Sequence, residues 1–285
     1  MFKTVSVKNF KALNTIENVP FSKVTLIGGR NEAGKTTLLE ALFLYCKRKN
    51  QNTIMELTGL RGFAYIPLDV EYMWAPLFSN SDMTKDIVIS VAEEDGISRE
   101  LLIKYNDQFN PKIPIPVTNG EYISPGKASA QGYKALSFKH DADYLAHSIL
   151  HSNGLSHWIE QGGAENNHPV CYIGPSMLLT DDNPELLSKL DKNDEQDKIL
   201  SLLRIFEPDL KRLQLLKQGK RDVIYADLGN RQKIPVNMLG SGFCRSMTLA
   251  LILAAGNNEK IFIDEIENGI HHLHIKKYWD FIFES

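Results

Sequence analysis

The residues best suited to chemistry form a glycine-rich loop, Gly29-Arg30-Asn31-Glu32-Ala33-Gly34-Lys35-Thr36, which fits G-x-x-x-x-G-K-[ST] at every position. An apolar run precedes the loop, and a predicted helix follows it. Glycines let a backbone curl around phosphate oxygens, and N–H groups at a helix N-terminus point at the anion. The pattern predicts a nucleoside triphosphate site in which Lys35 reaches the β- and γ-phosphates, Thr36 holds Mg²⁺ and Thr37 is a further phosphate donor.

A second candidate set is the acid- and histidine-rich run Phe262–His274, FIDEIENGIHHLH. A phosphate loop needs a carboxylate at the end of a buried strand to hold the metal. Asp264 is therefore predicted to hold Mg²⁺ and Glu265 to polarise the attacking water as general base. A transition-metal cage that includes the histidines is the alternative. We favour the phosphate-site interpretation, because adjacent strand residues point to opposite faces and no cysteine is near.

The third set is the segment Leu239–Arg245, LGSGFCR, which lies directly before an apolar helix. Glycines and a serine at a helix N-terminus form another anion-binding nest. A Gly-Ser-Gly turn is common in loops, so the pattern alone is weak. Its position one helix and one strand upstream of the acids makes Ser241 and Gly242 candidate nucleotide contacts.

Composition excludes several classes of protein. The chain has 285 residues, a net charge of −3 and a hydrophobic fraction of 43%, as in an ordinary globular protein of one large or two small domains. A direct DNA contact would need a local basic patch or a partner. The three scattered cysteines favour a reducing, cytoplasmic setting, and no apolar run is long enough to span a bilayer.

The elements that must position these residues can be read from periodicity and turn signals. The predicted strands are Phe2–Phe10, Val24–Ile27, Ile87–Ala92, Arg99–Tyr105, Val170–Ile173 and Lys260–Ile263. The predicted helices are Thr37–Cys46, Asp141–His151, Pro184–Leu190, Glu195–Phe206 and Arg245–Ala255. Hairpins are expected at residues 93–98 and at Gly229-Asn230, and a surface loop or inserted arm at 110–127. The basic residues 47–49 are read as a solvated helix end, with DNA contact as the alternative.

In order along the chain, these blocks resemble the ABC-type ATPases of the SMC/RecF/OLD class, and OLD-like ATPases in particular. The similar blocks are an opening strand (FKTVSVKNFKAL), a Walker A motif (IGGRNEAGKTTLLEAL), a signature motif with its helix (LGSGFCRSMTLALIL) and a Walker B motif with its D-loop (IFIDEIENGIHH).

The resemblance implies an α/β P-loop NTPase fold: an ABC-type ATPase head with a mixed or parallel core sheet, an antiparallel β subdomain and helical insertions. It implies a single ATPase domain, with a Walker A lobe at 1–50, an inserted arm region at 51–170 and a signature and Walker B lobe at 171–285. ATP and Mg²⁺ would lie between two head-to-tail copies, so that Ser241 and Gly242 touch the partner's nucleotide. Residues 266–271 would form the D-loop at that interface.

Some departures from the class leave its function open. The signature reads LGSGF rather than LSGGQ, and neither Gln131 nor Gln161 has the context of a Q-loop. The strand with a switch histidine and the Toprim nuclease domain expected after Walker B are missing, as in a truncated chain or one that relies on a partner. The leading hypothesis is an ATPase that dimerises, or forms a higher oligomer, and regulates an effector, a nuclease in antiphage defence. The alternatives are a RecF-type repair ATPase that binds DNA and a weakly hydrolysing nucleotide sensor. A transporter ATPase fits least.

Overall fold

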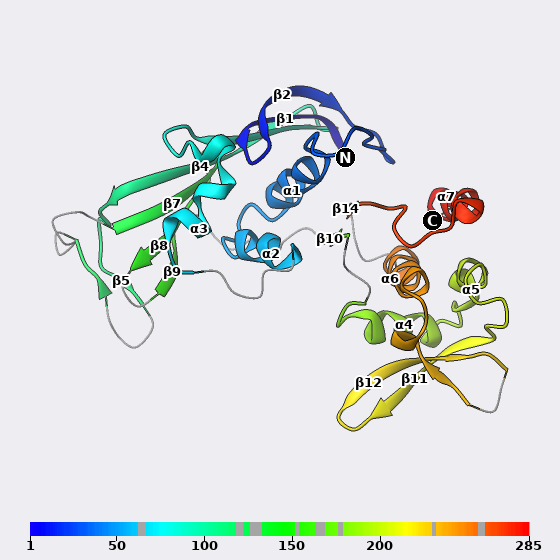
Figure 1. Ribbon diagram of the computed structural model, residues 1–285. Coiled ribbons are helices and arrows are strands. Elements are labelled where there is room, and N and C mark those ends of the chain that lie inside the picture. The colour runs from blue at the N-terminus through cyan, green and yellow to red at the C-terminus, as the bar shows by residue number, and fades with distance from the viewer. Residues whose placement is uncertain are drawn as a thin grey trace. The chain divides into compact units, whose positions relative to one another are not determined.

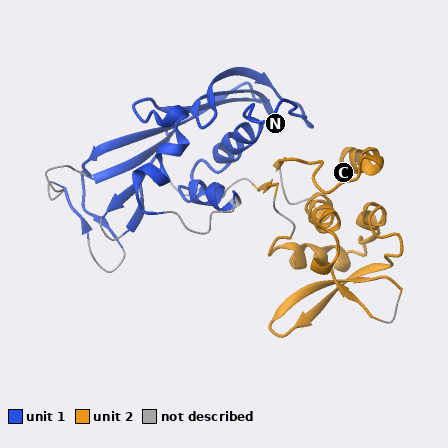
Figure 2. Ribbon diagram, in the orientation of Figure 1, with its two compact units in different colours: residues 1–168 blue, residues 169–285 orange. Residues whose placement is uncertain are grey.

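The computed structural model describes residues 1–61, 67–117, 122–125, 133–151, 154–162, 169–175, 179–229, 232–255 and 260–284. The chain divides into two compact units, Met1–His168 and Pro169–Ser285, which are blue and orange in Figure 2. The glycine-rich loop belongs to the first unit, whereas the signature segment Leu239–Arg245 and the acids Asp264 and Glu265 belong to the second.

Unit 1 is built on a seven-stranded sheet in the order β2-β1-β3-β4-β7-β8-β9, with every neighbouring pair antiparallel (Figure 1). In strands such as β3 the apolar residues alternate with more exposed ones, as expected when one face covers a core. The strands are β1 (Phe2–Phe10), β2 (Leu13–Pro20), β3 (Ile87–Glu93), β4 (Ser98–Phe109), β7 (Tyr133–His140), β8 (Tyr144–His151) and β9 (Gly154–Gln161).

Helix α1 (Lys35–Cys46) packs against this sheet and confirms the helix predicted after the loop. Its residues 40–46 are all buried, and the Tyr45 ring meets Phe2 of β1 edge-on, with 5.9 Å between ring centres. The helix is therefore fixed by apolar burial on several sides. The other helical elements are α2 (Thr53–Leu60), α3 (Val70–Met73) and the 3₁₀ turns Ala75–Leu77 and Ser79–Ser81.

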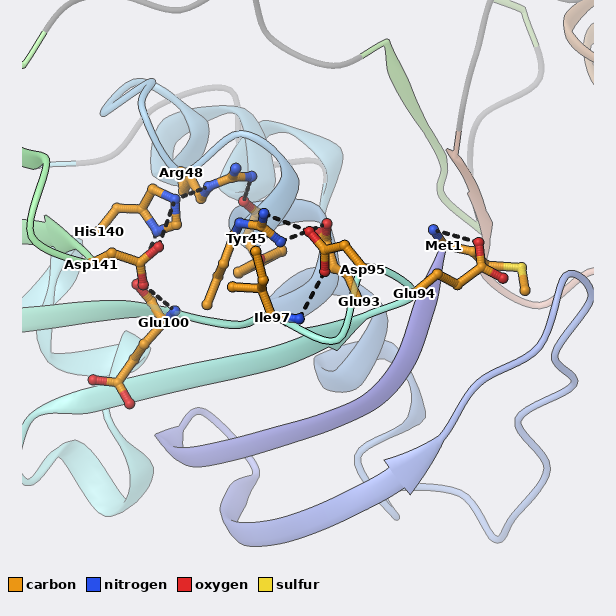
Figure 3. A network of polar contacts seen from close by, with 11 residues as sticks. Met1, Tyr45, Arg48, Glu93, Glu94, Asp95, Ile97, Glu100, His140 and Asp141 are labelled. Carbon is orange, nitrogen blue, oxygen red and sulfur yellow. Dashed lines mark hydrogen bonds and ion pairs between the residues drawn. The ribbon is translucent and has the colours of Figure 1, made fainter.

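A polar network holds the C-terminal end of α1 to the sheet (Figure 3). Arg48 Nε–H donates to His140 Nε2 at 2.6 Å, and the guanidinium carbon lies 4.9 Å from the centre of the Tyr45 ring. His140 Nδ1–H donates to the Glu100 carbonyl at 3.0 Å. The basic turn after α1 is therefore half-buried and paired, rather than fully solvated as the sequence suggested.

The prediction of a strand at Val24–Ile27 is wrong for this structure, which has irregular backbone there. A strand needs a neighbouring backbone to pair with. Among the described residues of unit 1, no strand pairs with this segment, and the side chains of Val24 and Leu26 are 40% and 73% exposed.

The prediction of a helix at Asp141–His151 is also wrong. Asp141 has a left-handed φ of 46° and accepts a hydrogen bond from Glu100 N–H through Oδ1 at 2.8 Å, and the chain then turns back as β8. A short apolar run cannot be assigned to helix or strand by periodicity alone, and antiparallel pairing with β7 decides in favour of the strand.

The described part of the predicted arm contains a small pair of strands, β5 (Ile115–Pro116) and β6 (Tyr122–Ile123). Ile115 and Ile123 are buried with Phe109 in a satellite core on the sheet. Gly120 and Gly126, two of the turn residues expected in this arm, lie outside the described residues.

Unit 2 surrounds helix α6 (Ser241–Ala255), which lies at the centre of its apolar core (Figure 1). Strands β10 (Val170–Ile173) and β14 (Lys260–Ile263) confirm the two strands predicted there, and they pair in parallel. The remaining elements are α4 (Asn183–Lys192), α5 (Asp197–Leu203), α7 (Ile275–Glu284), β11 (Arg212–Gln218), β12 (Arg221–Asp227), β13 (Ile234–Pro235) and the 3₁₀ turns Val236–Met238 and His272–His274.

Several predictions for unit 2 hold with shifted bounds. The two helices expected after residue 183 are present, although α5 is shorter than predicted, and α6 begins four residues early, at Ser241. Strand β12 pairs with β13 as expected, but Asn230 lies outside the described residues. The longer hairpin joins β11 to β12 and was not predicted. Within the described ranges, no helix is long and apolar enough to cross a membrane.

Candidate active site

The nine loop residues predicted to bind nucleotide, Gly29 to Thr37, lie together where the irregular segment of unit 1 meets α1. Glu32 and Gly34 have left-handed φ angles of 64° and 88°. A Cβ atom on Gly34 would lie 2.8 Å from Leu13 Cδ2, so both the backbone and the packing require glycine there. The Leu38 N–H donates to the Gly34 carbonyl at 2.9 Å, and α1 therefore begins directly at this turn.

The loop is curled around the ammonium group of Lys35. Its Nζ donates to the carbonyls of Gly29 and Arg30, at 2.8 and 2.9 Å. The first N–H groups of a helix lack intrahelical acceptors, and α1 begins at Lys35. Together the ammonium and the helix N-terminus are suited to bind an anion.

Solvent exposure of the loop residues decreases toward α1, as is expected of a binding loop on a fixed helix. Residues 29–33 are exposed, Gly34 to Thr36 are half-buried and Thr37 is buried. A ligand can therefore approach the loop from solvent while the helix behind it is fixed. The Thr36 hydroxyl is at the position where the sequence pattern places the Mg²⁺ ligand.

A buried carboxylate secures α1 one turn beyond the loop. Glu40 is 2% exposed and accepts hydrogen bonds from Arg61 Nε at 2.6 Å, Arg61 Nη2 at 2.8 Å and Lys11 Nζ at 2.9 Å. Burial lowers the pKa of Lys11, and the Glu40 charge opposes that shift. Glu40 is not among the residues predicted from the sequence, although a single acid within the apolar run TLLEALFLYC was a signal.

In unit 2, the two predicted catalytic acids follow β14 directly. Asp264 is 3% exposed, its N–H donates to the Ile173 carbonyl at 2.9 Å, and its Oδ2 accepts from Tyr172 Oη at 3.4 Å. Glu265 is exposed and has a left-handed φ of 49°. Asn268 Nδ2 donates to Glu265 Oε2 at 2.6 Å, which orients the carboxylate within the following turn.

The signature segment and the turn after the acids are in direct contact through two glycines. Ser241 and Gly242 form the first turn of α6; Ser241 is exposed and Gly242 is buried. A Cβ atom built on Gly242 would lie 2.1 Å from the Gly269 carbonyl oxygen, and one on Gly269 would lie 2.9 Å from Gly242 Cα. The structure therefore gives Gly242 a packing role inside unit 2.

Arg245, on the next turn of α6, is a residue that our sequence reasoning assigned no function. The residue is 3% exposed, and its guanidinium donates to the carbonyls of Gly174 and Pro175 after β10 and of Asp264 and Glu265 after β14. Burial lowers the pKa of Arg245, and Tyr278, Glu265, Asp264 and Glu267 act in the opposite direction. Backbone acceptors leave no sequence signal, so no pattern could have revealed these contacts.

The histidines after the acids do not form a metal cage. The ring centres of His271 and His272 are 4.3 Å apart, and those of His271 and His274 are 6.0 Å apart. Across the described ranges, no group of three or more His, Cys, Asp or Glu side chains could hold a metal ion. Of the two Q-loop candidates, Gln161 donates to the Ala142 carbonyl at 3.0 Å, and Gln131 lies outside the described residues.

The glycine-rich loop at the start of a buried helix, in an α/β chain with a large sheet, agrees with a P-loop nucleotide-binding protein, although the segment before the loop is irregular and not a strand. Residues 1–153 match the family described as AAA ATPase domain, and the chain belongs to that family. It is an ATP-hydrolysing enzyme. The matched range contains the phosphate loop, whereas the signature segment and the acids lie outside it.

The chain is also similar over nearly its whole length to a protein of Helicobacter pylori named ATP/GTP phosphatase. The two sequences are 22% identical, and the similarity covers 99% of this chain and 81% of the relative.

Proposed function

We propose that this protein is a Mg²⁺-dependent ATPase with an ABC-type head of the SMC/RecF/OLD class, closest to OLD-like ATPases. The observation that carries the proposal is the contact between Gly242 and Gly269, because it joins the signature segment to the turn that follows the acids. A chance Gly-Ser-Gly turn has no reason to pack there. The ATP/GTP phosphatase name of the H. pylori relative agrees with nucleotide hydrolysis by this chain.

The loop residues Gly29 to Thr37 bind the triphosphate in this proposal. Lys35 gives up its carbonyl partners, Gly29 and Arg30, to contact the β- and γ-phosphates. The Thr36 hydroxyl and the Asp264 carboxylate would hold Mg²⁺, since hydroxyl and carboxylate oxygens suit that ion. When bound, Mg²⁺ neutralises charge on the phosphate oxygens.

Glu265 acts as the general base that accepts the proton of the attacking water. Its carboxylate is exposed, so water can reach it, and Asn268 fixes its direction. Asp264 is buried beside it and is assigned to the metal rather than to the water.

The active form in this proposal is a homodimer, or a higher oligomer, with ATP held between head-to-tail copies. The Ser241 residue is exposed and can reach a nucleotide bound to the partner copy, whereas Gly242 has no side chain and can contribute only backbone groups. The oligomer would regulate an effector, and the class resemblance points to a nuclease in antiphage defence. Contact with DNA belongs to the alternative RecF-type activity.

Steady-state ATP hydrolysis tests the proposed site through Lys35→Ala and Glu265→Gln. Lys35→Ala is expected to abolish ATP binding, and Glu265→Gln to keep binding but lower turnover by about 100-fold or more. Glu185→Gln is the matched control, because Glu185 is an exposed acid on α4 of unit 2 and lies outside the motifs. Wild-type turnover by Glu265→Gln would exclude Glu265 as the base.

The dimer is tested with the same variant by size-exclusion chromatography. Since Glu265→Gln should trap ATP, adding ATP and Mg²⁺ is expected to produce an earlier-eluting species, and adding ADP is not. If ATP leaves the elution volume unchanged in this variant, the head-to-tail dimer is wrong.

A further inference from the structure

The guanidinium of Arg245 spans the C-terminal ends of both parallel strands of unit 2. Nη1 donates to the Gly174 carbonyl at 2.6 Å and to the Pro175 carbonyl at 2.9 Å, directly after β10. Nη2 donates to the Asp264 carbonyl and, at 3.1 Å, to the Glu265 carbonyl, directly after β14. One side chain therefore fixes the backbone at the point where the acids leave the sheet.

The backbone of Glu265 needs such support. Its φ of 49° is in the left-handed region, which is unfavourable for an L-residue other than glycine. Such a conformation persists only where the surrounding contacts determine it. The hydrogen bond from Arg245 to the Glu265 carbonyl is one of those contacts. The preceding residue, Asp264, is buried and further restricts the backbone.

Arg245 also links the acids to the signature turn. It lies four residues after Ser241 on α6, so the two side chains belong to the same face of the helix, one turn apart. The Gly242–Gly269 contact is a second link between α6 and the turn that carries the acids, at the C-terminal end of that turn. A shift of the first turn of α6 must therefore move the turn that carries Glu265.

We propose that Arg245 is a positioning residue for ATP hydrolysis, which holds the Asp264–Glu265 turn so that the Glu265 carboxylate faces the attacking water. Through Arg245, a movement of the signature turn also moves the Glu265 carboxylate. The proposal rests on the function proposed above for Glu265. It requires the planar fork of arginine, because a lysine ammonium keeps the charge but cannot span four carbonyls on two strands.

The test is the split between turnover and ATP affinity in Arg245→Lys. We expect kcat to fall by about 10- to 100-fold, because small displacements of a catalytic group cost that much, while the Kd for a non-hydrolysable ATP analogue is unchanged. Arg204→Lys is the matched control, because Arg204 also donates to two carbonyls in unit 2, those of Leu210 and Lys211. The control is expected to keep wild-type kcat.

A double-mutant cycle with Glu265→Gln separates positioning from general structural support. If Arg245 acts through Glu265, Arg245→Lys costs no further turnover in single-turnover hydrolysis when Glu265 is already glutamine. Equal losses in both backgrounds, or wild-type kcat in Arg245→Lys, overturn the proposal. If Arg245→Lys does not fold, Arg245→Gln takes its place, since the amide keeps N–H donors but lacks the guanidinium fork, and the same loss of kcat at unchanged Kd is expected.

The two hypotheses fail in different ways. Wild-type turnover in Glu265→Gln overturns the role of Glu265, and the role of Arg245 with it. An inactive Glu265→Gln beside a fully active Arg245→Lys overturns the role of Arg245 alone.

Discussion

His140 joins the turn after α1 to the sheet of unit 1. Its Nε2 accepts from Arg48 at the end of α1, and its Nδ1–H donates to the Glu100 carbonyl (Figure 3). Burial lowers the pKa of His140, the Glu100 hydrogen bond opposes that shift, and the Arg48 charge adds to it. A proton on Nε2 would remove the acceptor and place two cations side by side.

The stability of the protein is therefore expected to fall in acid through His140. Because its pKa is lower in the folded chain, this contribution is complete above the unfolded value of about 6.5 and is lost as pH falls through the folded value. Urea unfolding at a series of pH values should show this decrease. His140→Gln keeps an acceptor for Arg48 and should flatten the profile; an unchanged slope would contradict the assignment.

Among single residues, those within a motif could be named as candidates from the sequence, and those with backbone partners could not. Lys35 and Asp264 belong to patterns whose chemistry fixes the residue type, so both were named from sequence. Arg245 and Gly269 act through carbonyls and close backbone approach, which depend on where distant strands and turns meet. Such contacts exist only in the folded chain.

Among elements, helix α1 and strand β14 could be predicted from local sequence. A glycine-rich loop marks the start of α1, and β14 is a short apolar run that ends at two acids. The segment Val24–Ile27 has the same β-branched character as a strand but pairs with no strand in the described part of unit 1. Strand β8 was predicted as helix for a related reason, since its pairing with β7 carries no local signal. In both cases tertiary pairing decides what propensity leaves open.

The junction between the phosphate loop and α1 depends on glycine at position 34. Gly34→Ala would place a methyl group 2.8 Å from Leu13 Cδ2, in a left-handed conformation that costs about 1–2 kcal/mol. We expect weaker ATP binding and a lower midpoint of thermal unfolding, measured by nucleotide titration and calorimetry. Gly28→Ala is the control, because an added Cβ there meets no atom within 4 Å and φ is not left-handed. Equal behaviour of the two variants would argue against a special role for Gly34.

At the scale of the whole molecule, the candidate residues belong to two separately packed units. If Lys35 binds the phosphates and Asp264 helps to hold Mg²⁺, ATP with Mg²⁺ should slow amide hydrogen exchange at residues 30–37 and also at residues 264–269. ATP with EDTA should protect only the first segment, because the acids then lack their ion. Lys35→Ala is expected to lose both effects. Protection confined to unit 1 under all conditions would separate the acids from the nucleotide site.

The division into units also gives the protein an order of assembly. Unit 1 has its own sheet and core and contains the whole phosphate loop, so it can fold while later residues are still being added at the ribosome. At about 5–20 residues per second, Glu265 is added roughly 5–20 s after residue 168. During that interval the nascent chain has a loop that can hold nucleotide but none of the acids assigned to hydrolysis. We expect such a chain to capture ATP without consuming it.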